Sequence, residues 1–382
     1  MTTVQVSPEV AGIVDQLRSA RRDKFPLRIV GGGTWLDAGR PTSADDRLEL
    51  GTFSGITSYE PDDLTLTARA GTSLAEIDRA TVAHGQWMTL DPFGSSRGTL
   101  GATIATGSCG PLASAFGTPR DHVLGCEFVS GAGEVIRAGG RVVKNVAGFD
   151  LVRLATGAWG TIGAITEVTV RLRARPEVER TLAVSIGGDQ TTITDAWRSL
   201  REGDLTLLAA ELVSPSLGQE LSLGGPSLLV RLGGNRILVD SAATTVASLG
   251  ECSAAPDEVW RELADAEPKS AIVFRVSTLP SSVDVLWMRA SRLAEDAGGY
   301  AHASITRGVV RCVLPLIDDH QSFDHLNGEL AALAEHFTVV GERLPASLWN
   351  VVTRARSTDD LARKVRLAFD PDCVMNRGIL GA

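Results

Sequence analysis

The sequence predicts an α+β protein of two domains, and three observations lead to this prediction. The chain has 382 residues, which is enough for two hydrophobic cores. Glycine is dense up to about residue 175 and becomes rarer beyond Pro176. From that point the pattern changes to strands that alternate with helices. We therefore expect one domain over residues 1–175, a second over residues 176–360, and a short tail over residues 361–382.

Composition is typical of a soluble globular protein. Apolar residues make up 43% of the chain and charged residues 22%, both ordinary values. The net charge of −9 is spread along the chain without long runs of one sign, which argues against nucleic-acid binding. No apolar segment is long enough to span a bilayer, and the N-terminus lacks the pattern of an export signal. We therefore expect a cytoplasmic location.

The first domain is predicted to contain short strands and few helices. Ser7 is a candidate N-cap and Pro8 suits a first helical turn, so we expect a helix from Ser7 to Ala20. A second helix is expected from a cap at Thr72 or Ser73 to the glycine that follows His84. Alternation of apolar residues predicts strands over residues 28–30, 48–50, 56–59, 62–71, 126–130, 134–137 and 165–172, and a further helix is expected over residues 151–155.

Three glycines directly follow the first predicted strand. The run Gly31–Gly33 precedes Thr34 and Trp35. The pattern GxGxxG is absent, and Gly39 and Pro41 interrupt the helix that a Rossmann unit would need next. The loop is therefore predicted to offer backbone N–H groups to a ligand without being part of a Rossmann fold.

The longest glycine-rich stretch runs from Asp91 to Arg175. The residues between its glycines are mostly Ser, Thr and Ala, which leave backbone N–H groups accessible. Such N–H groups bind anions, and glycine allows a ligand to touch the backbone. We interpret the stretch as loops that wrap a phosphate-bearing cofactor. A set of tight turns in a β-protein is the alternative interpretation.

Motifs in this stretch resemble a known flavoprotein family. Residues 99–110 and 117–125 resemble the second half of the flavin-binding domain of the vanillyl-alcohol oxidase and p-cresol methylhydroxylase (PCMH) type. Residues 141–151 and 157–163 are similar, more narrowly, to the glycolate oxidase and D-2-hydroxyacid dehydrogenase branch, and best to an FAD-binding subunit of bacterial glycolate oxidase. The resemblance implies a two-subdomain PCMH-type FAD-binding domain. It leaves two interpretations for Lys144, a surface ion pair or a role beside the flavin.

The resemblance also implies which residues hold FAD. They are Gly31, Gly32, Gly33, Thr34, Trp35, Pro92, Gly98, Thr99, Leu100, Gly101, Ala102, Thr106, Gly107, Gly110, Gly117, Asp121, Val123, Gly160, Ile162, Gly163 and Ile165. Trp35 stands where the family has a small polar residue. Covalent members attach the flavin through a His in the first glycine loop, and no His lies between Met1 and Gly71. We therefore expect non-covalent FAD.

The second domain is predicted to contain two rounds of alternating strands and helices. The first round has strand 181–186, helix 191–201 and strand 206–213, and the segments 227–232 and 235–249 continue the alternation. The second has strand 271–277, helix 283–297, strands 301–305 and 309–315, helix 320–337 and strand 338–341. In the family that the chain resembles, a pair of ferredoxin-like units forms an α/β cap over the flavin, and we expect the same cap here. The tail Phe369–Leu380 resembles the family's return to the FAD-binding domain.

Oxidation of a 2-hydroxy acid needs a base for the hydroxyl proton and a cation for the carboxylate. Arginine binds carboxylate in a bidentate way, so Arg275, Arg307 and Arg311 on the predicted cap strands are candidates. His302 is the candidate base. Because side chains alternate between the two faces of a strand, the sequence does not decide which of them face the flavin. The catalytic residues therefore stay unassigned at this level.

One motif of the catalytic relatives is missing from the chain. These relatives carry a Gly-Asp-Gly-Asn-x-His stretch in the cap, and several use its histidine in a metal site. The comparable segment Tyr300–Ser304 has one His and no acidic neighbour, and the five cysteines are scattered without a Cys-x-x-Cys pair. We therefore expect no metal site and no iron–sulfur cluster in this chain. The missing motif also predicts that the isolated chain oxidises 2-hydroxy acids slowly.

From the resemblance we interpret the chain as an FAD-binding subunit of a glycolate oxidase-like complex. The complex would oxidise glycolate or a related 2-hydroxy acid to the 2-oxo acid. The expected partners are a second flavin subunit and an iron–sulfur subunit, and any membrane association would come through them. Two alternatives stay open: a free-standing FAD-dependent D-2-hydroxyacid dehydrogenase of the D-lactate type, and a flavin-carrying assembly subunit without turnover of its own.

Overall fold

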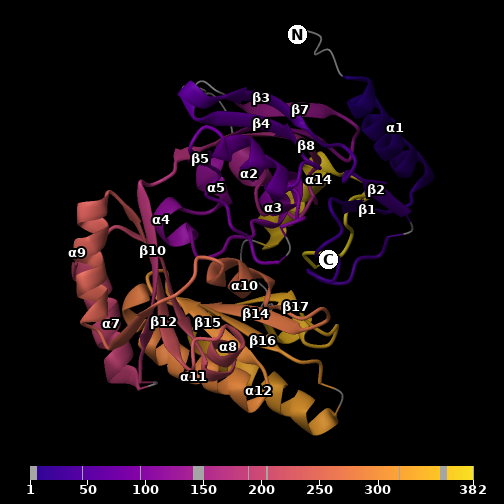
Figure 1. The fold of residues 1–382 in the computed structure, drawn as a ribbon. Helices are drawn as coiled ribbons and strands as arrows, with labels where there is room; N and C mark the ends of the chain where they lie inside the picture. The colour runs from indigo at the N-terminus through magenta and orange to yellow at the C-terminus, as the bar shows by residue number, and fades with distance from the viewer. Residues whose placement is uncertain are drawn as a thin grey trace.

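The computed structural model describes residues 7–44, 46–94, 96–140, 150–187, 189–203, 205–317, 319–352 and 359–381. An N-terminal domain lies above a cap domain in Figure 1, and the C-terminal segment returns from the cap to the N-terminal domain. Both domains combine helices with antiparallel sheets. The predicted α+β fold class is therefore confirmed.

The centre of the N-terminal domain is a five-stranded antiparallel sheet with the order β3-β4-β8-β6-β7. Its strands are β3 (Ile56–Glu60), β4 (Thr65–Arg69), β6 (Val123–Val129), β7 (Val135–Gly139) and β8 (Ala164–Arg171). The helices of this part are α2 (Leu74–Val82), α3 (Leu100–Thr106), α4 (Ala113–Phe116), α5 (Pro119–His122) and α6 (Leu151–Ala155). Phe128 on β6 and Leu100 and Ile104 on α3 are fully buried between sheet and helices, which anchors α3 on the sheet.

A smaller subdomain consists of helix α1 (Pro8–Asp23) and the parallel strands β1 (Leu27–Val30) and β2 (Asp46–Glu49). Ser7 caps α1, since its side chain accepts a hydrogen bond from the Val10 N–H at 3.3 Å. The C-terminal tail lies along β1, because the Leu27 N–H donates to the Val374 carbonyl at 2.7 Å. The two ends of the chain are thus joined beside the glycine loop that follows β1.

The cap is built on one eight-stranded sheet with the order β13-β10-β12-β11-β15-β16-β14-β17. Its first four strands in the chain are β10 (Val178–Ser185), β11 (Leu207–Val213), β12 (Ser227–Gly234) and β13 (Glu251–Ala254). The last four are β14 (Ile272–Ser277), β15 (Tyr300–Ser304), β16 (Val309–Leu314) and β17 (Thr338–Arg343). Each set of four has the strand order of a ferredoxin-like unit, and antiparallel pairing of β11 with β15 joins the two units. The predicted pair of units therefore shares one continuous sheet.

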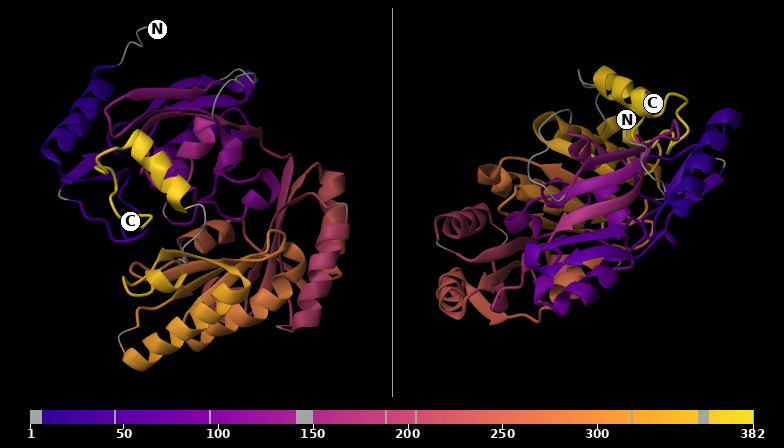
Figure 2. Two further views of the ribbon diagram at one scale, coloured as in Figure 1. Left: turned by 180° about the vertical axis from the view of Figure 1, so that it is seen from behind. Right: turned by 90° about the horizontal axis from the view of Figure 1, so that it is seen from above.

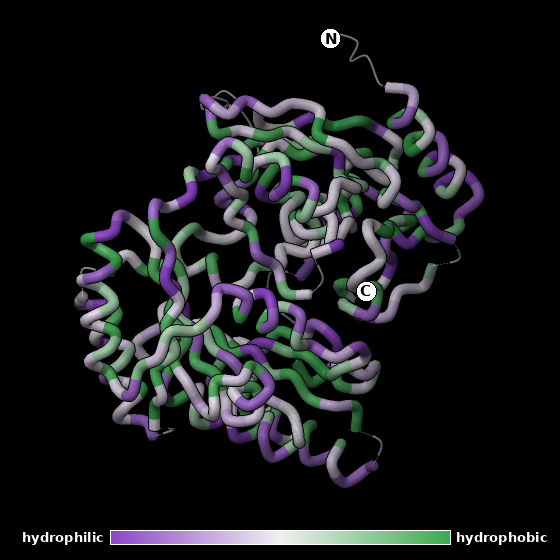
Figure 3. Tube along the Cα trace, viewed as in Figure 1, coloured by the Kyte–Doolittle hydropathy of each residue, from purple (hydrophilic) through white to green (hydrophobic). Residues whose placement is uncertain are grey.

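Helices cover the two faces of the cap sheet unequally. One face packs against α7 (Gln190–Glu202), α9 (Arg236–Ala247), α11 (Val283–Asp296) and α12 (His320–His336), which lie on the outer side of the cap in Figure 2. The other face carries α8 (Pro215–Glu220) and α10 (Val259–Asp265) and looks toward the N-terminal domain. Hydrophobic residues concentrate along the strands in Figure 3, as a sheet covered on both faces requires.

Short elements complete the described chain. They are β5 (Gln86–Trp87), which pairs with β9 (Arg173–Ala174), the 3₁₀ turns η1 (Pro61–Asp63) and η2 (Pro280–Ser282), and helices α13 (Trp349–Val352) and α14 (Asp359–Phe369). None of the helices in the described ranges is both long and apolar enough to cross a membrane.

Several elements differ from the sequence prediction. The strand expected from residue 62 begins only at Thr65, because Pro61–Asp63 form a 3₁₀ turn. Helix α3 was predicted as part of a loop, since its sequence Leu-Gly-Ala-Thr-Ile-Ala-Thr contains poor helix formers. Its stability comes from packing of Leu100 and Ile104 and from the Thr99 cap, which are tertiary and local effects that propensity does not include. Strand β13 and helices α8 and α10 were not predicted.

Candidate functional site

A cleft in the N-terminal domain lies between the glycine loop after β1 and helix α3. Its cavity has a volume of about 130 Å³. A Cβ atom on Gly31 would lie 2.5 Å from Thr99 Oγ1, and one on Gly32 would lie 2.8 Å from the Arg97 carbonyl oxygen. The two segments approach too closely for side chains at these positions, so the backbone itself lines this part of the cleft.

The glycine loop after β1 forms part of the lining of the cleft. Gly32, Gly33 and Thr34 are exposed, and no described residue accepts a hydrogen bond from their N–H groups. Backbone N–H groups in such a loop bind phosphate. This part of the cleft therefore fits the diphosphate of a dinucleotide cofactor.

Most residues predicted to hold FAD line this cleft. They are Gly31, Gly32, Gly33, Thr34, Trp35, Pro92, Gly98, Thr99, Gly101, Ala102, Thr106, Gly160, Gly163 and Ile165. Gly101 also has a packing role, since a Cβ atom there would lie 2.5 Å from the Cβ atom of Ala70. The glycine lets α3 approach the end of β4, so a larger side chain would displace the helix as well as narrow the cleft.

The remaining predicted residues lie elsewhere. Leu100 and Ile162 belong to the core of the domain, and Gly107 and Gly110 line a second cavity between the domains. Gly117, Asp121 and Val123 lie outside both cavities. Asp121 closes a turn there, because it accepts a hydrogen bond from the Thr118 N–H at 2.7 Å. Direct contacts of these residues with FAD stay a prediction, as do both interpretations of Lys144, which lies outside the described residues.

The second cavity lies between the two domains and has a volume of about 350 Å³. Its lining includes Trp35, Phe93 and Trp159, which also line the first cavity. The rings of Trp35 and Trp159 are stacked with centroids 5.9 Å apart. The two cavities are therefore adjacent, and a cofactor held by the glycine loop can extend toward the interdomain cavity.

Three candidate side chains of the cap form one row in this cavity. His302 on β15 is paired with Arg311 on β16, and Arg311 is paired in turn with Arg275 on β14. Paired residues of adjacent strands point to the same face of a sheet. All three line the interdomain cavity together with Arg307 from the turn between β15 and β16. The structure thus brings together every cap residue that the sequence named as a candidate for substrate binding or catalysis.

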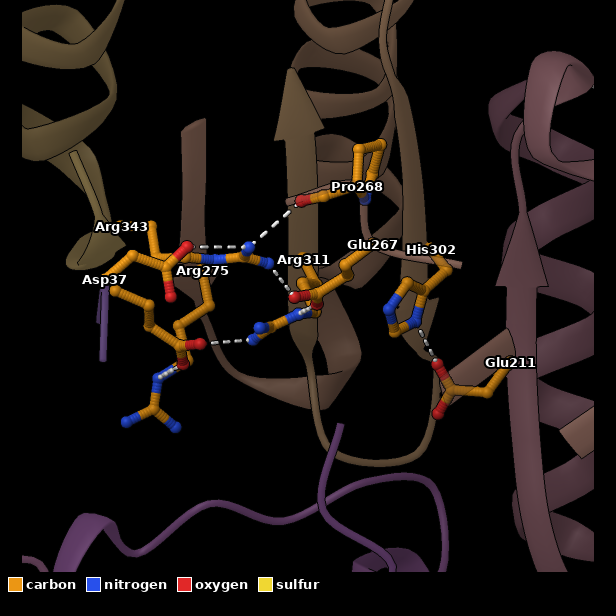
Figure 4. A network of polar contacts seen from close by, with 9 residues as sticks. Asp37, Glu211, Glu267, Pro268, Arg275, His302, Arg311 and Arg343 are labelled. Carbon is orange, nitrogen blue, oxygen red and sulfur yellow. Dashed lines mark hydrogen bonds and ion pairs between the residues drawn. The ribbon is translucent and has the colours of Figure 1, made fainter. Parts of the chain in front are cut away.

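A buried network of ion pairs holds this row (Figure 4). Glu267 accepts hydrogen bonds from both Arg311 and Arg343. Glu342 lies 2.6 Å from Arg311 Nη1 and 3.3 Å from Arg275 Nε. Burial opposes the charge of Glu267, but Arg311 and Arg343 hold the pKa of its carboxyl below the usual value. Arg343 also reaches Asp37 of the N-terminal domain at 3.3 Å, which links the network across the domain boundary.

His302 has a carboxylate partner that the sequence did not indicate. Its Nδ1 lies 2.8 Å from Glu211 Oε2, and only 5% of the His302 side chain and 2% of the Glu211 side chain are exposed. Glu211 lies on β11, in the other ferredoxin-like unit. The pair therefore forms only when β11 and β15 become neighbours at the centre of the sheet.

Arg307 lines the cavity and, like Arg40, has no carboxylate partner among the described residues. Its only described hydrogen bond is from Nη2 to the Cys109 sulfur at 3.7 Å. Arg275 and Arg311, by contrast, are both paired with Glu342. Arg307 therefore has a charge available for an anion in the cavity.

Three further residues of the site were missed by sequence reasoning. The Phe93 ring contacts both Arg311, whose guanidinium carbon is 4.5 Å from the ring centroid, and His302, whose ring centroid is 5.0 Å away. Trp159 has a left-handed backbone with φ of 54°. Asn376 of the tail accepts from the Ile29 N–H at 2.8 Å and donates to the Trp159 carbonyl at 2.7 Å. A large aromatic residue inside each glycine-rich segment was the signal available for the first two.

Comparisons with known proteins support FAD as the cofactor. Residues 8–139 match the family of the FAD binding domain. The glycolate oxidase subunit GlcE of Escherichia coli (strain K12) is 38% identical over 172 residues, which are 44% of this chain and 49% of that protein. The D-lactate dehydrogenase of Archaeoglobus fulgidus is 26% identical over 97% of this chain and 89% of its own length. The match to the glycolate oxidase subunit GlcE therefore spans about half the length of that relative.

A solved structure supports the fold over nearly the whole chain. An alkyldihydroxyacetonephosphate synthase superposes with a TM-score of 0.70 at 15% identity, covering 96% of this chain and 75% of that one. FAD also fits the residues present, because the bare N–H groups of the glycine loop suit its diphosphate and the adjacent cavity has room for its ring. Residues 8–139 thus match an FAD binding domain, and the chain is similar to relatives named glycolate oxidase subunit and D-lactate dehydrogenase.

Proposed function

We propose that this protein oxidises a small 2-hydroxy acid to the corresponding 2-oxo acid. The observation that carries the proposal is the interdomain cavity beside the glycine-loop cleft, because both Arg307 and His302 line it. Relatives named glycolate oxidase subunit and D-lactate dehydrogenase support the same class of substrate. When bound, FAD would supply the acceptor for the hydride that leaves C2 of the substrate.

The residues of the chain would supply the other two requirements. Arg307 would hold the substrate carboxylate, since its guanidinium has no described carboxylate partner and can form a bidentate contact. His302 would take the proton of the hydroxyl group, since imidazole is an effective base near neutral pH. Phe93 and the stacked pair of Trp35 and Trp159 would exclude water from the reacting groups.

The finer part of the proposal concerns partners. We propose that the chain works as a flavin subunit of a glycolate oxidase-like complex, beside a second flavin subunit and an iron–sulfur subunit that carries electrons onward. The resemblance to a glycolate oxidase subunit supports this assembly. The free-standing D-2-hydroxyacid dehydrogenase remains the second candidate, because His302 and Arg307 belong to this chain alone and line one cavity.

Anaerobic reduction of the FAD-loaded chain tests the proposal. Glycolate and D-lactate are added separately, and the absorbance of oxidised flavin is followed. At least one acid should bleach the flavin, either with the purified chain or after addition of the partner subunits. Bleaching of the chain alone favours the free-standing enzyme, and bleaching only with partners favours the complex. Absence of bleaching in both cases would overturn the proposal and favour an assembly role.

A pair of arginine variants tests the site itself. Arg307→Met should raise the substrate concentration for half-maximal reduction by at least about tenfold, since a charge-assisted pair contributes about 1.5–3 kcal/mol. Arg292→Met is the matched control, because Arg292 is 83% exposed on the outer helix α11. Equal behaviour of the two variants would exclude Arg307 from the binding of the carboxylate.

A further inference from the structure

The contact between Glu211 and His302 differs from the surrounding ion pairs. Glu211 is paired with Ser304 across the β11–β15 ladder, and His302 is paired with Val213. The two side chains are therefore diagonal neighbours on the same face of the sheet, a distance that a carboxylate and an imidazole can span. Both are almost completely buried. The backbone register thus holds both groups at fixed positions in the cavity wall.

The chemistry of the pair decides which ring nitrogen carries the proton. An ionised carboxylate only accepts hydrogen bonds, so Nδ1 of neutral His302 must donate to Glu211. This leaves Nε2 as the acceptor of the ring. Figure 4 shows this second nitrogen on the side of Glu267 and Arg311, and no described residue forms a hydrogen bond with it. The His302 residue itself lines the interdomain cavity.

We propose that Glu211 is a positioning residue that holds His302 as the Nδ1–H tautomer, with Nε2 free to accept the substrate hydroxyl proton. The inference rests on the proposed function. When the C2–H bond breaks and its hydride leaves for FAD, the O–H proton passes to Nε2, and the C2–O bond becomes a double bond. The imidazolium that forms then donates to Glu211 through Nδ1. The negative charge of Glu211 stabilises that cation in a buried site.

The charges around His302 determine the direction of the effect. Arg311 lies beside the ring and opposes its protonation, but Glu267 and Glu342 neutralise Arg311. The charged or titratable groups that face the pair from neighbouring elements are Arg275 (β14), Arg307 (turn between β15 and β16), Arg311 (β16), Glu342 and Arg343 (β17), Glu267 (before β14), Arg231 (β12) and Asp91 (N-terminal domain). Substitution of Glu211 by a neutral residue removes the negative charge that lies 2.8 Å from Nδ1 of the ring. The imidazolium then becomes less stable.

Three variants separate charge, hydrogen bonding and general effects of substitution. Glu211→Gln keeps the shape and removes the charge, and Glu211→Leu also removes the acceptor. Glu127→Gln is the matched control, because Glu127 is a largely buried carboxylate on β6 that accepts from Thr166 Oγ1 at 2.7 Å and lines neither cavity. Far-UV circular dichroism and flavin content establish that each variant folds and binds FAD.

Nitrogen NMR of the histidine rings in the FAD-loaded protein gives a readout that does not depend on turnover. The signal of His302 is identified by its loss in His302→Gln. Wild-type protein and Glu127→Gln should show the Nδ1–H tautomer, and Glu211→Leu should change to Nε2–H. A wild-type Nε2–H tautomer, or no change in Glu211→Leu, would overturn the inference even if 2-hydroxy acids reduce the flavin.

The pH profile of flavin reduction gives the second readout. Glu211→Leu should reduce the maximal rate by about 10²–10⁴-fold with little change in substrate affinity, as expected when a general base is lost. Glu211→Gln should move the acidic limb of the profile to lower pH, because the ring then loses its proton more easily. Unchanged rate and profile in both variants would reject the positioning role. If no 2-hydroxy acid reduces wild-type protein, the proposed function fails, and the NMR result alone decides the tautomer.

Discussion

Asp91 and Gly110 are in direct contact beside the interdomain cavity, which Gly110 lines. The Gly110 N–H donates to Asp91 Oδ1 at 3.2 Å, and a Cβ atom on Gly110 would lie 2.1 Å from the Asp91 carbonyl oxygen. The Leu112 N–H donates to the other oxygen of the same carboxyl at 2.8 Å. Asp91 thereby holds the loop that follows α3, and Gly110 is required by this contact with protein.

Substitution of Gly110 should therefore reduce stability whether or not FAD is bound. Gly110→Ala should lower the free energy of unfolding by about 1–3 kcal/mol, because the added methyl group overlaps backbone that cannot move freely. Gly12→Ala in α1 is the control, since a Cβ atom there meets nothing within 4 Å and should stabilise the helix by up to about 1 kcal/mol. Urea denaturation of apo and FAD-loaded protein measures both. A loss confined to the FAD-loaded form would favour direct contact of Gly110 with the cofactor.

Asp91 should also make stability depend on pH. Burial raises the pKa of its carboxyl to about 7, although the Leu112 and Gly110 N–H groups and Arg231 act in the opposite direction. In the unfolded chain this pKa is about 3.9. The native state therefore binds the proton more tightly, and this contribution to stability is full below about pH 4 and lost as the pH rises to about 7. The unfolding free energy of the wild type minus that of Asp91→Asn should therefore decrease as the pH rises over this range. A difference that stays constant with pH would contradict the raised pKa of Asp91.

His122 should produce the opposite dependence. Burial lowers the pKa of its imidazole, and its Nε2 is buried without a hydrogen-bond partner among the described residues. The unfolded state then binds the proton more tightly, so stability is full above about pH 6.5 and is lost as the pH falls below that value. His122→Leu should remove this loss. Melting temperatures measured between pH 5 and 8 test it, and equal slopes for variant and wild type would show that His122 does not contribute.

Neutralising substitutions at two carboxylates of the interdomain ion network should have very different effects on stability. Glu267 is only 5% exposed and is shared by Arg311 and Arg343, so Glu267→Gln should cost about 3–5 kcal/mol by leaving buried charges unpaired. Asp37 is 46% exposed, and Asp37→Asn should cost less than about 1 kcal/mol. Denaturation of both variants by urea provides the comparison. Similar costs would mean that burial does not determine the strength of this network.

FAD should be released by acid. No His lies between Met1 and Gly71, where covalent members of the family carry the linking histidine, and the loop Gly31–Thr34 offers only backbone groups and a hydroxyl. Precipitation of yellow protein with acid should leave the flavin in the supernatant. Yellow colour retained in the washed pellet would demonstrate a covalent bond.

Sequence patterns predicted the parts of this protein that depend on local chemistry. Strand alternation and helix periodicity located most elements, and the Ser7 cap and the glycine turns follow from rules that act over a few residues. The first glycine loop was recognised for the same reason, because accessible backbone N–H groups need only small neighbours. Helix α3 was missed since its stability depends on burial of Leu100 and Ile104 against the sheet.

The tertiary structure alone decided which polar side chains of the cap share a cavity. Strand alternation divides residues into two sets but does not say which set faces the N-terminal domain. That choice follows from the helices α7, α9, α11 and α12, which cover the other face and leave His302, Arg311 and Arg275 toward the cleft. Glu211 could not be predicted at all, because its contact with His302 depends on pairing of β11 with β15, strands separated by about ninety residues. Local sequence encodes each strand, whereas the register between distant strands is set by the packing of the whole sheet.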